Sequence, residues 1–64
     1  MVNLRELRLA AGLSQWQLAA LTEFVVSQPA ISILERGFRK PSARQIEALA
    51  KALKLSPEQL QDAA

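Results

Sequence analysis

Three Ser-x-x-Gln motifs divide this chain into short segments and constrain its fold more than any other feature of the sequence. They begin at Ser14, Ser42 and Ser56, and each matches the capping box, in which the two side chains bond free amides at the start of a helix. Asn3 and Ser27 are two further candidate N-caps. No alternating strand pattern accompanies them. The sequence therefore predicts an all-α fold, a compact bundle of five short helices.

Helix ends and apolar stripes complete this outline. Gly12 is placed to end the first helix in a left-handed conformation, and Gly37 closes the third. The second helix is expected to end between Thr22 and Phe24. Apolar residues recur at helical spacing within these segments. They predict a buried core that contains Leu4, Leu7, Ala11, Leu18, Ala19, Leu21, Ile31, Leu34, Ile46, Leu49, Ala50, Leu53 and Leu60.

The composition excludes several classes of protein. The 64 residues suffice for one domain, residues 1–64, but not for two. The chain has no cysteine and no histidine, so thiolate ligands and the commonest general base are missing. We therefore expect no enzyme activity, no metal and no cofactor. Because no apolar run approaches the roughly 20 residues of a membrane span, and no signal peptide is apparent at the N-terminus, we expect a cytoplasmic protein.

The charges are unevenly distributed along the chain. The net charge is +2, yet residues 36–54 carry six basic side chains and one acidic side chain, a local charge of +5. A basic segment directly after the third predicted helix is typical of a surface that binds a polyanion. A solvated basic helix face is the alternative interpretation.

Residues 13–37 predict two short helices joined by a turn, which is a helix-turn-helix. A longer ordered set of residues, from the first to the fourth predicted helix, carries a more specific resemblance to a known family. These residues are Leu4, Leu7, Arg8, Gly12, Leu13, Ser14, Gln15, Leu18, Ala19, Val26, Ser27, Ile31, Ser32, Leu34, Glu35, Arg36, Gly37, Pro41, Ser42, Leu49, Ala50 and Leu53. In these, the chain resembles the helix-turn-helix domains of Cro and phage repressors, the XRE-type family. The resemblance implies a lambda-repressor-like fold and a sequence-specific transcriptional repressor. A repressor of this kind would bind double-stranded DNA at a palindromic operator as a homodimer. Its third helix, about residues 28–35, would lie in the major groove. We expect the dimer surface around Leu55 and Leu60.

The resemblance implies that four residues of the third helix face the bases, namely Ser27, Gln28, Ser32 and Ile33. The Gln28 amide can form a bidentate pair with adenine, worth about 1–3 kcal/mol of discrimination. Ser32 can donate or accept a hydrogen bond, which gives little selectivity. Ile33 has no polar group, so its partner is either a thymine methyl, the protein core or a second copy.

The resemblance implies phosphate contacts at the start of the second helix and after the third, at Gln15, Arg36, Arg39, Lys40 and Arg44. Free amides and a neutral donor at a helix N-terminus suit a phosphate oxygen, although Gln15 is also an ordinary exposed first-turn residue. The basic residues would neutralise phosphates without reading sequence. The resemblance also pairs Arg8 with Glu35 as a structural ion pair across the first and third helices.

The turn between the two helices departs from the family pattern. The interval 13–35 is two residues longer than expected, and residues 22–26 contain no glycine. Either the second helix runs half a turn further, or the turn is longer and packs Phe24 or Val25 inward. We expect Trp16 to pack over this turn, or else to contact the DNA backbone through its indole N–H. If Trp16, Phe24 and Val25 are exposed, they favour the alternative function, a protein-interaction module such as an antitoxin or adaptor.

Overall fold

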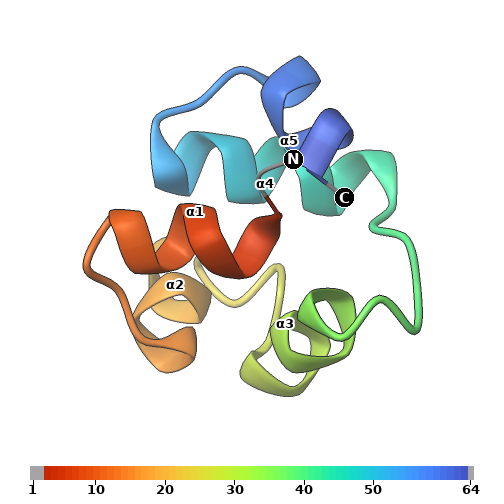
Figure 1. Ribbon diagram of the computed structural model, residues 1–64. Coiled ribbons are helices and arrows are strands. Elements are labelled where there is room, and N and C mark those ends of the chain that lie inside the picture. Colours follow the sequence, from red (N-terminus) through yellow and green to blue (C-terminus); the bar gives the residue numbers. More distant parts are fainter. Residues whose placement is uncertain (1–2, 64) are drawn as a thin grey trace.

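The computed structural model describes residues 3–63, which contain five helices and no strand. The helices are α1 (Leu4–Ala10), α2 (Gln15–Leu21), α3 (Gln28–Glu35), α4 (Ala43–Leu53) and α5 (Pro57–Ala63). Helix α4 lies across the middle of the molecule, with α5 on one side and α1, α2 and α3 on the other (Figure 1). The predicted all-α bundle of five helices is confirmed.

Side-chain caps fix the helix starts where the sequence predicted them. Asn3 and Ser27 each accept a hydrogen bond from an amide in the following turn. In the three Ser-x-x-Gln motifs, which begin at Ser14, Ser42 and Ser56, the two side chains bond each other's backbone amides. Each bond satisfies an amide that has no partner inside its helix. The starts of α1 to α5 are therefore set by local chemistry.

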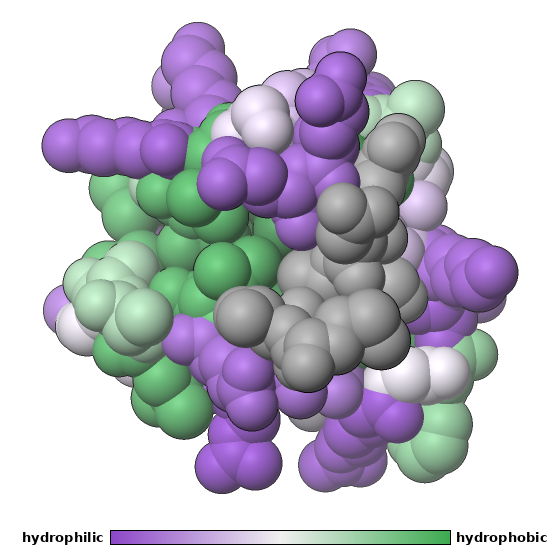
Figure 2. All heavy atoms as spheres, turned by 45° about the horizontal axis from the view of Figure 1, so that its top comes forward, coloured by the Kyte–Doolittle hydropathy of each residue, from purple (hydrophilic) through white to green (hydrophobic). Residues whose placement is uncertain are grey.

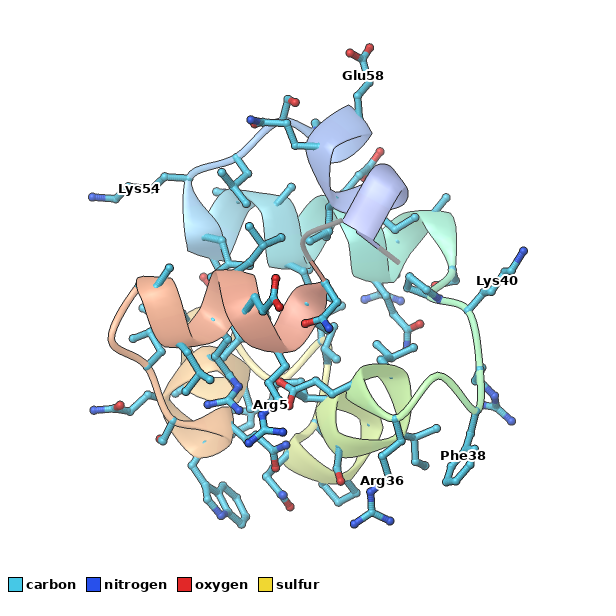
Figure 3. The ribbon with its side chains drawn as sticks, in the orientation of Figure 1. Arg5, Arg36, Phe38, Lys40, Lys54 and Glu58 are labelled. Atoms are coloured by element: carbon cyan, nitrogen blue, oxygen red, sulfur yellow. The ribbon has the colours of Figure 1, made fainter. Side chains whose placement is uncertain are left out.

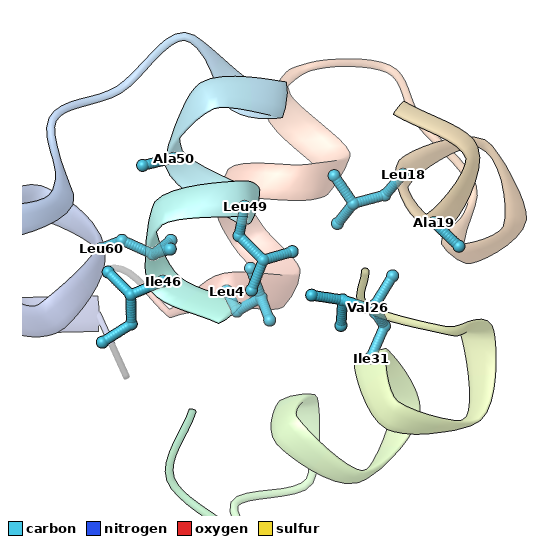
Figure 4. Packing of buried hydrophobic residues seen from close by; sticks show 9 residues of the cluster. All are labelled: Leu4, Leu18, Ala19, Val26, Ile31, Ile46, Leu49, Ala50 and Leu60. Carbon is cyan, nitrogen blue, oxygen red and sulfur yellow. The ribbon is translucent and has the colours of Figure 1, made fainter. Parts of the chain in front are cut away.

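The core contains nine buried apolar side chains that come from every helix and from the α2–α3 turn (Figure 4). They are Leu4, Leu18, Ala19, Val26, Ile31, Ile46, Leu49, Ala50 and Leu60. Burying a side chain the size of leucine contributes about 1.5–3 kcal/mol to folding. Because Leu60 is only 1% exposed, it belongs to the core and is not free to form the expected dimer surface.

The core prediction was wrong at Ala11 and Leu21, which are exposed. Helix α2 points Leu18, Ala19 and Thr22 inward instead, a stripe with spacings of one and three residues. This rotation leaves Leu21 at the edge of α2, beside a shallow hollow that Val25 also lines.

The lengthened turn follows a helix that ends at Leu21, so α2 does not run half a turn further. The N–H of Phe24 donates to Ala19 O, and the N–H of Glu23 donates to Ala20 O, both at 2.9 Å. These two bonds form a Schellman motif, which normally places glycine at the left-handed position. Here Glu23 and Phe24 both have positive φ, 56° and 60°, although this conformation costs a non-glycine residue roughly 1–2 kcal/mol.

A buried threonine closes this turn. The Thr22 hydroxyl donates to Ala19 O at 2.7 Å and accepts from the N–H of Val26 at 3.3 Å. Val26 is fully buried, whereas Phe24 is 62% and Val25 is 39% exposed. The expectation that Phe24 or Val25 packs inward was therefore wrong, because Thr22 bends the chain so that Val26 reaches the core. Trp16 is 65% exposed, so it does not pack over the turn either.

Candidate nucleic-acid interface

A buried ion pair joins α1 to α3. Arg8 Nε donates to Glu35 Oε2 at 2.6 Å, and Arg8 Nη2 donates to Glu35 Oε1 at 3.2 Å. A third bond runs from Arg8 Nη1 to Leu13 O, at 2.8 Å. The side chains of Arg8 and Glu35 are only 9% and 5% exposed. The hydrogen bonds from Arg8 to Glu35 raise the pKa of Arg8 above its ordinary value, against the opposing effect of burial. The pair thus holds α3 against α1 and the α1–α2 loop.

A chain of hydrogen bonds continues from this ion pair to the first residue of α3. Gln15 Nε2 donates to Glu35 Oε1 at 3.1 Å, and Gln28 Nε2 donates to Gln15 Oε1 at 2.8 Å. An ionised carboxylate can only accept hydrogen bonds, so Gln15 must turn its amino group toward Glu35 and its carbonyl toward Gln28. Gln28 must then donate to Gln15. The charge of Glu35 therefore sets the direction of both amides, and it leaves Gln28 Oε1 and one Gln28 N–H available.

These groups lie in a polar hollow of about 420 Å³ between α1, α2 and α3. The hollow is lined by Arg5, Arg8, Gln15, Gln28, Ser32, Glu35 and Arg36. Arg5 and Arg36 lie on the α3 side of the molecule, far from Lys54 and Glu58 (Figure 3). Among the side chains of residues 3–60, Arg8 and Glu35 form the only ion pair. Arg5 and Arg36 therefore keep unbalanced positive charge, which suits an anionic partner.

The hollow brings together some of the residues that the sequence indicated and leaves others outside. Gln15, Gln28, Ser32 and Arg36 line it. The remaining residues lie outside its lining, and these are Ser27, Ile33, Arg39, Lys40 and Arg44. Ile33 is 42% exposed, so the core is not its partner.

The structure shows the local surroundings of two residues that lie outside the hollow, Ser27 and Arg44. The hydroxyl of Ser27 accepts the cap bond of α3, from the N–H of Ala30. Arg44 stands exposed in the first turn of α4, which contains no acidic residue. A cation there opposes the helix dipole, so its position does not serve the stability of α4.

Sequence reasoning missed Arg5. No pattern in the sequence assigned it a role, and only the packing of α1 against α3 places it in the hollow. One local signal was available, since Arg5 lies at the second position of α1. A cation there is disfavoured by the helix dipole.

A model of the helix-turn-helix domain family matches residues 2–63, nearly the whole chain. The chain belongs to this helix-turn-helix family. Helix α2, the turn and α3 form the helix-turn-helix itself, and membership is consistent with the resemblance to Cro and phage repressors. The helix-turn-helix domain supports a DNA-binding regulator as the general function of the chain. Searches among curated proteins and among solved structures found no significant match.

The described part of the chain contains neither a candidate membrane span nor a candidate metal site. Helices long and apolar enough to cross a membrane are not found within residues 3–63. The described acidic side chains form no group of three that could hold a metal ion. Helix-turn-helix domains typically act by binding rather than by catalysis, which agrees with the polar, positively charged character of the hollow.

Proposed function

We propose that the protein is a sequence-specific DNA-binding transcriptional regulator, and that α3 enters the major groove. The observation that carries this proposal is the hydrogen-bond chain from Glu35 through Gln15 to Gln28. It presents one Gln28 N–H and the Gln28 carbonyl with a fixed orientation at the start of α3. That pair of groups matches N7 and N6–H of adenine, whose recognition is worth about 1–3 kcal/mol. Ser32 and Ile33 extend the same contact surface along α3.

The phosphate contacts belong to the residues around this helix. Arg36, Arg39, Lys40 and Arg44 would position α3 by neutralising phosphates, since phosphate contacts carry no sequence information directly. Gln15 has one amide N–H left after its bonds to Glu35 and Gln28. That N–H is the group with which Gln15 would reach a phosphate oxygen.

We also propose that two copies bind a palindromic operator and repress transcription by occupying the promoter. One helix of this size reads few base pairs, and a dimer places two such helices on half-sites about 34 Å apart. An exposed apolar area supports the association of two copies. It lies at the left of Figure 2, on the side where α1 and α4 end in Figure 1. A role on chromosomal DNA would place the protein in the cytoplasm.

Selection from a random duplex pool, followed by titration of selected and scrambled duplexes, tests the proposal. A regulator should bind the selected duplex at least about 10³-fold more tightly. Gln28→Ala should reduce discrimination at a single base pair by about 1–3 kcal/mol. Gln59→Ala, in the first turn of α5, serves as the control and should leave base preference unchanged. Equal binding of selected and scrambled duplexes by the unaltered protein would refute sequence-specific recognition.

The exposed aromatic residues of the helix-turn-helix favour a second candidate, a protein-interaction module such as an antitoxin or adaptor. Trp16 lies in the first turn of α2 and Phe24 in the turn that follows α2, and both are more than half exposed. Exposed apolar surface of this kind often marks a partner site. This candidate predicts weak, sequence-blind DNA binding. It also predicts a protein complex that Trp16→Ser or Phe24→Ser disrupts while the melting temperature stays unchanged.

A further inference from the structure

We propose that Arg5 contacts a DNA phosphate on the side of α3 opposite to Lys40. This inference rests on the proposed function and adds a contact that the sequence did not indicate. Arg5 projects from the first turn of α1, and it lines the same hollow as Gln28, Ser32 and Arg36.

The stability of the domain does not account for an arginine at this place. Arg5 is exposed and forms no ion pair among the described side chains. It stands near the N-terminus of α1, where the helix dipole disfavours positive charge. Of the other charged side chains that line the hollow, Arg8 and Glu35 neutralise each other, and Arg36 is a further cation. Arg5 therefore adds a positive charge to the hollow that no acidic side chain among the described residues pairs with.

The arrangement around α3 supplies the reason for a phosphate contact. A major groove is about 12 Å wide and is bordered by phosphates of both strands, so a helix in the groove has phosphates on both sides. Figure 3 shows Arg5 on one side of α3 and Lys40 on the other. Lys40 is one of the basic residues that follow α3 in the chain, whereas Arg36, the first of them, lines the hollow together with Arg5. Arg5 is therefore the cation that α1 supplies for the border of the groove opposite to Lys40.

The site favours a phosphate over a base for Arg5. Helix α3 carries the side chains proposed to reach the base edges, and Arg5 comes from the scaffold helix beside it. The neighbouring amides of Gln15 and Gln28 are already oriented by Glu35. A guanidinium donates two parallel hydrogen bonds to a phosphate. Arg5 should therefore contribute affinity and its salt dependence, while base preference stays with α3.

The experiment compares the unaltered protein with Arg5→Gln, Arg5→Lys and Lys54→Gln on one selected and one scrambled duplex between about 50 and 200 mM salt. Lys54 is the matched control, because it is an exposed cation far from the hollow (Figure 3). Each phosphate contact contributes about −0.9 to the slope of log affinity against log salt. Arg5→Gln should reduce that slope by about 0.9 per bound protomer. At about 0.1 M salt this corresponds to a roughly eightfold loss of affinity.

The expected pattern is the same loss on both duplexes, an unchanged specificity ratio, recovery of the slope in Arg5→Lys, and no change in Lys54→Gln. Unchanged circular dichroism and melting temperature would establish that Arg5→Gln is folded. A slope equal to that of the unaltered protein would overturn the inference, and so would a fall in the specificity ratio alone, which would assign Arg5 to a base. If the unaltered protein shows no salt-dependent DNA binding, the proposed function fails first, and the two failures are thereby distinguished.

Discussion

Replacing Glu35 with alanine is the most informative perturbation of this domain, because Glu35 serves both the ion pair and the orientation of Gln28. The substitution removes the acceptor of two Arg8 bonds and one Gln15 bond. Arg8 would remain charged and only 9% exposed. We therefore expect Glu35→Ala to unfold the domain rather than merely to change its base preference.

The magnitude follows from the burial of the pair. Removing one partner of a buried ion pair costs about 3–5 kcal/mol, because the other charge is left uncompensated. A domain of 64 residues has a free energy of unfolding of roughly 3–10 kcal/mol. The loss is thus comparable to the whole stability. In contrast, replacing both partners by apolar residues of similar volume is often neutral or stabilising.

Urea unfolding followed by circular dichroism measures this effect, with Glu47→Ala as the control at an exposed glutamate that forms no ion pair in the described part of the chain. The double variant Arg8→Met, Glu35→Leu should fold. It should still lose discrimination at the base pair that Gln28 reads, because Gln15 then has no carboxylate to orient its amide. A Glu35→Ala protein that melts like the unaltered chain would refute the structural role of the pair. A double variant with full base discrimination would refute the orienting role.

Two further predictions concern the ends of helices. Glu23→Gly should raise the free energy of unfolding by roughly 1 kcal/mol, because glycine adopts the positive φ of this position without strain; a lower urea midpoint would contradict this. Ser42→Ala removes the acceptor of the Gln45 N–H at the start of α4 and should cost about 1 kcal/mol. Calorimetry should then record a fall in melting temperature of about 4–8 °C, whereas an unchanged melting temperature would show that the cap contributes nothing.

The helix starts could be predicted from the sequence, but only half of the helix ends could. Each of the helices α1 to α4 is followed within two residues by a residue of positive φ, and these residues are Gly12, Glu23, Gly37 and Lys54. The two glycines are local signals, since glycine adopts this conformation readily. Glu23 and Lys54 carry no such signal, because the core on either side forces the chain to turn there. For the same reason the sequence did not identify Val26 as the inward residue of the long turn.

The role of a residue in the hollow could be predicted from the sequence when it depends on one helix alone. It could not be predicted when it depends on how several helices pack. Gln28 and Ser32 follow from their places on the third helix. Gln15 was expected only at a phosphate, whereas its side chain also connects Glu35 with Gln28. Arg5 was missed because its place in the hollow depends on how α1 packs against α3. Contacts between residues distant in the chain leave no trace in the local pattern.

The bond between Thr22 and Val26 has a practical consequence for studying this protein. This hydrogen bond closes the turn. A group attached at the tip of the turn, residues 23–25, should therefore leave the conformation of the turn unchanged. The tip takes no part in the lining of the hollow, and the chain contains no cysteine. A cysteine introduced at Val25 would therefore be the only thiol of the protein. A fluorophore coupled to it would report on DNA binding at α3 from a position outside the lining of the hollow.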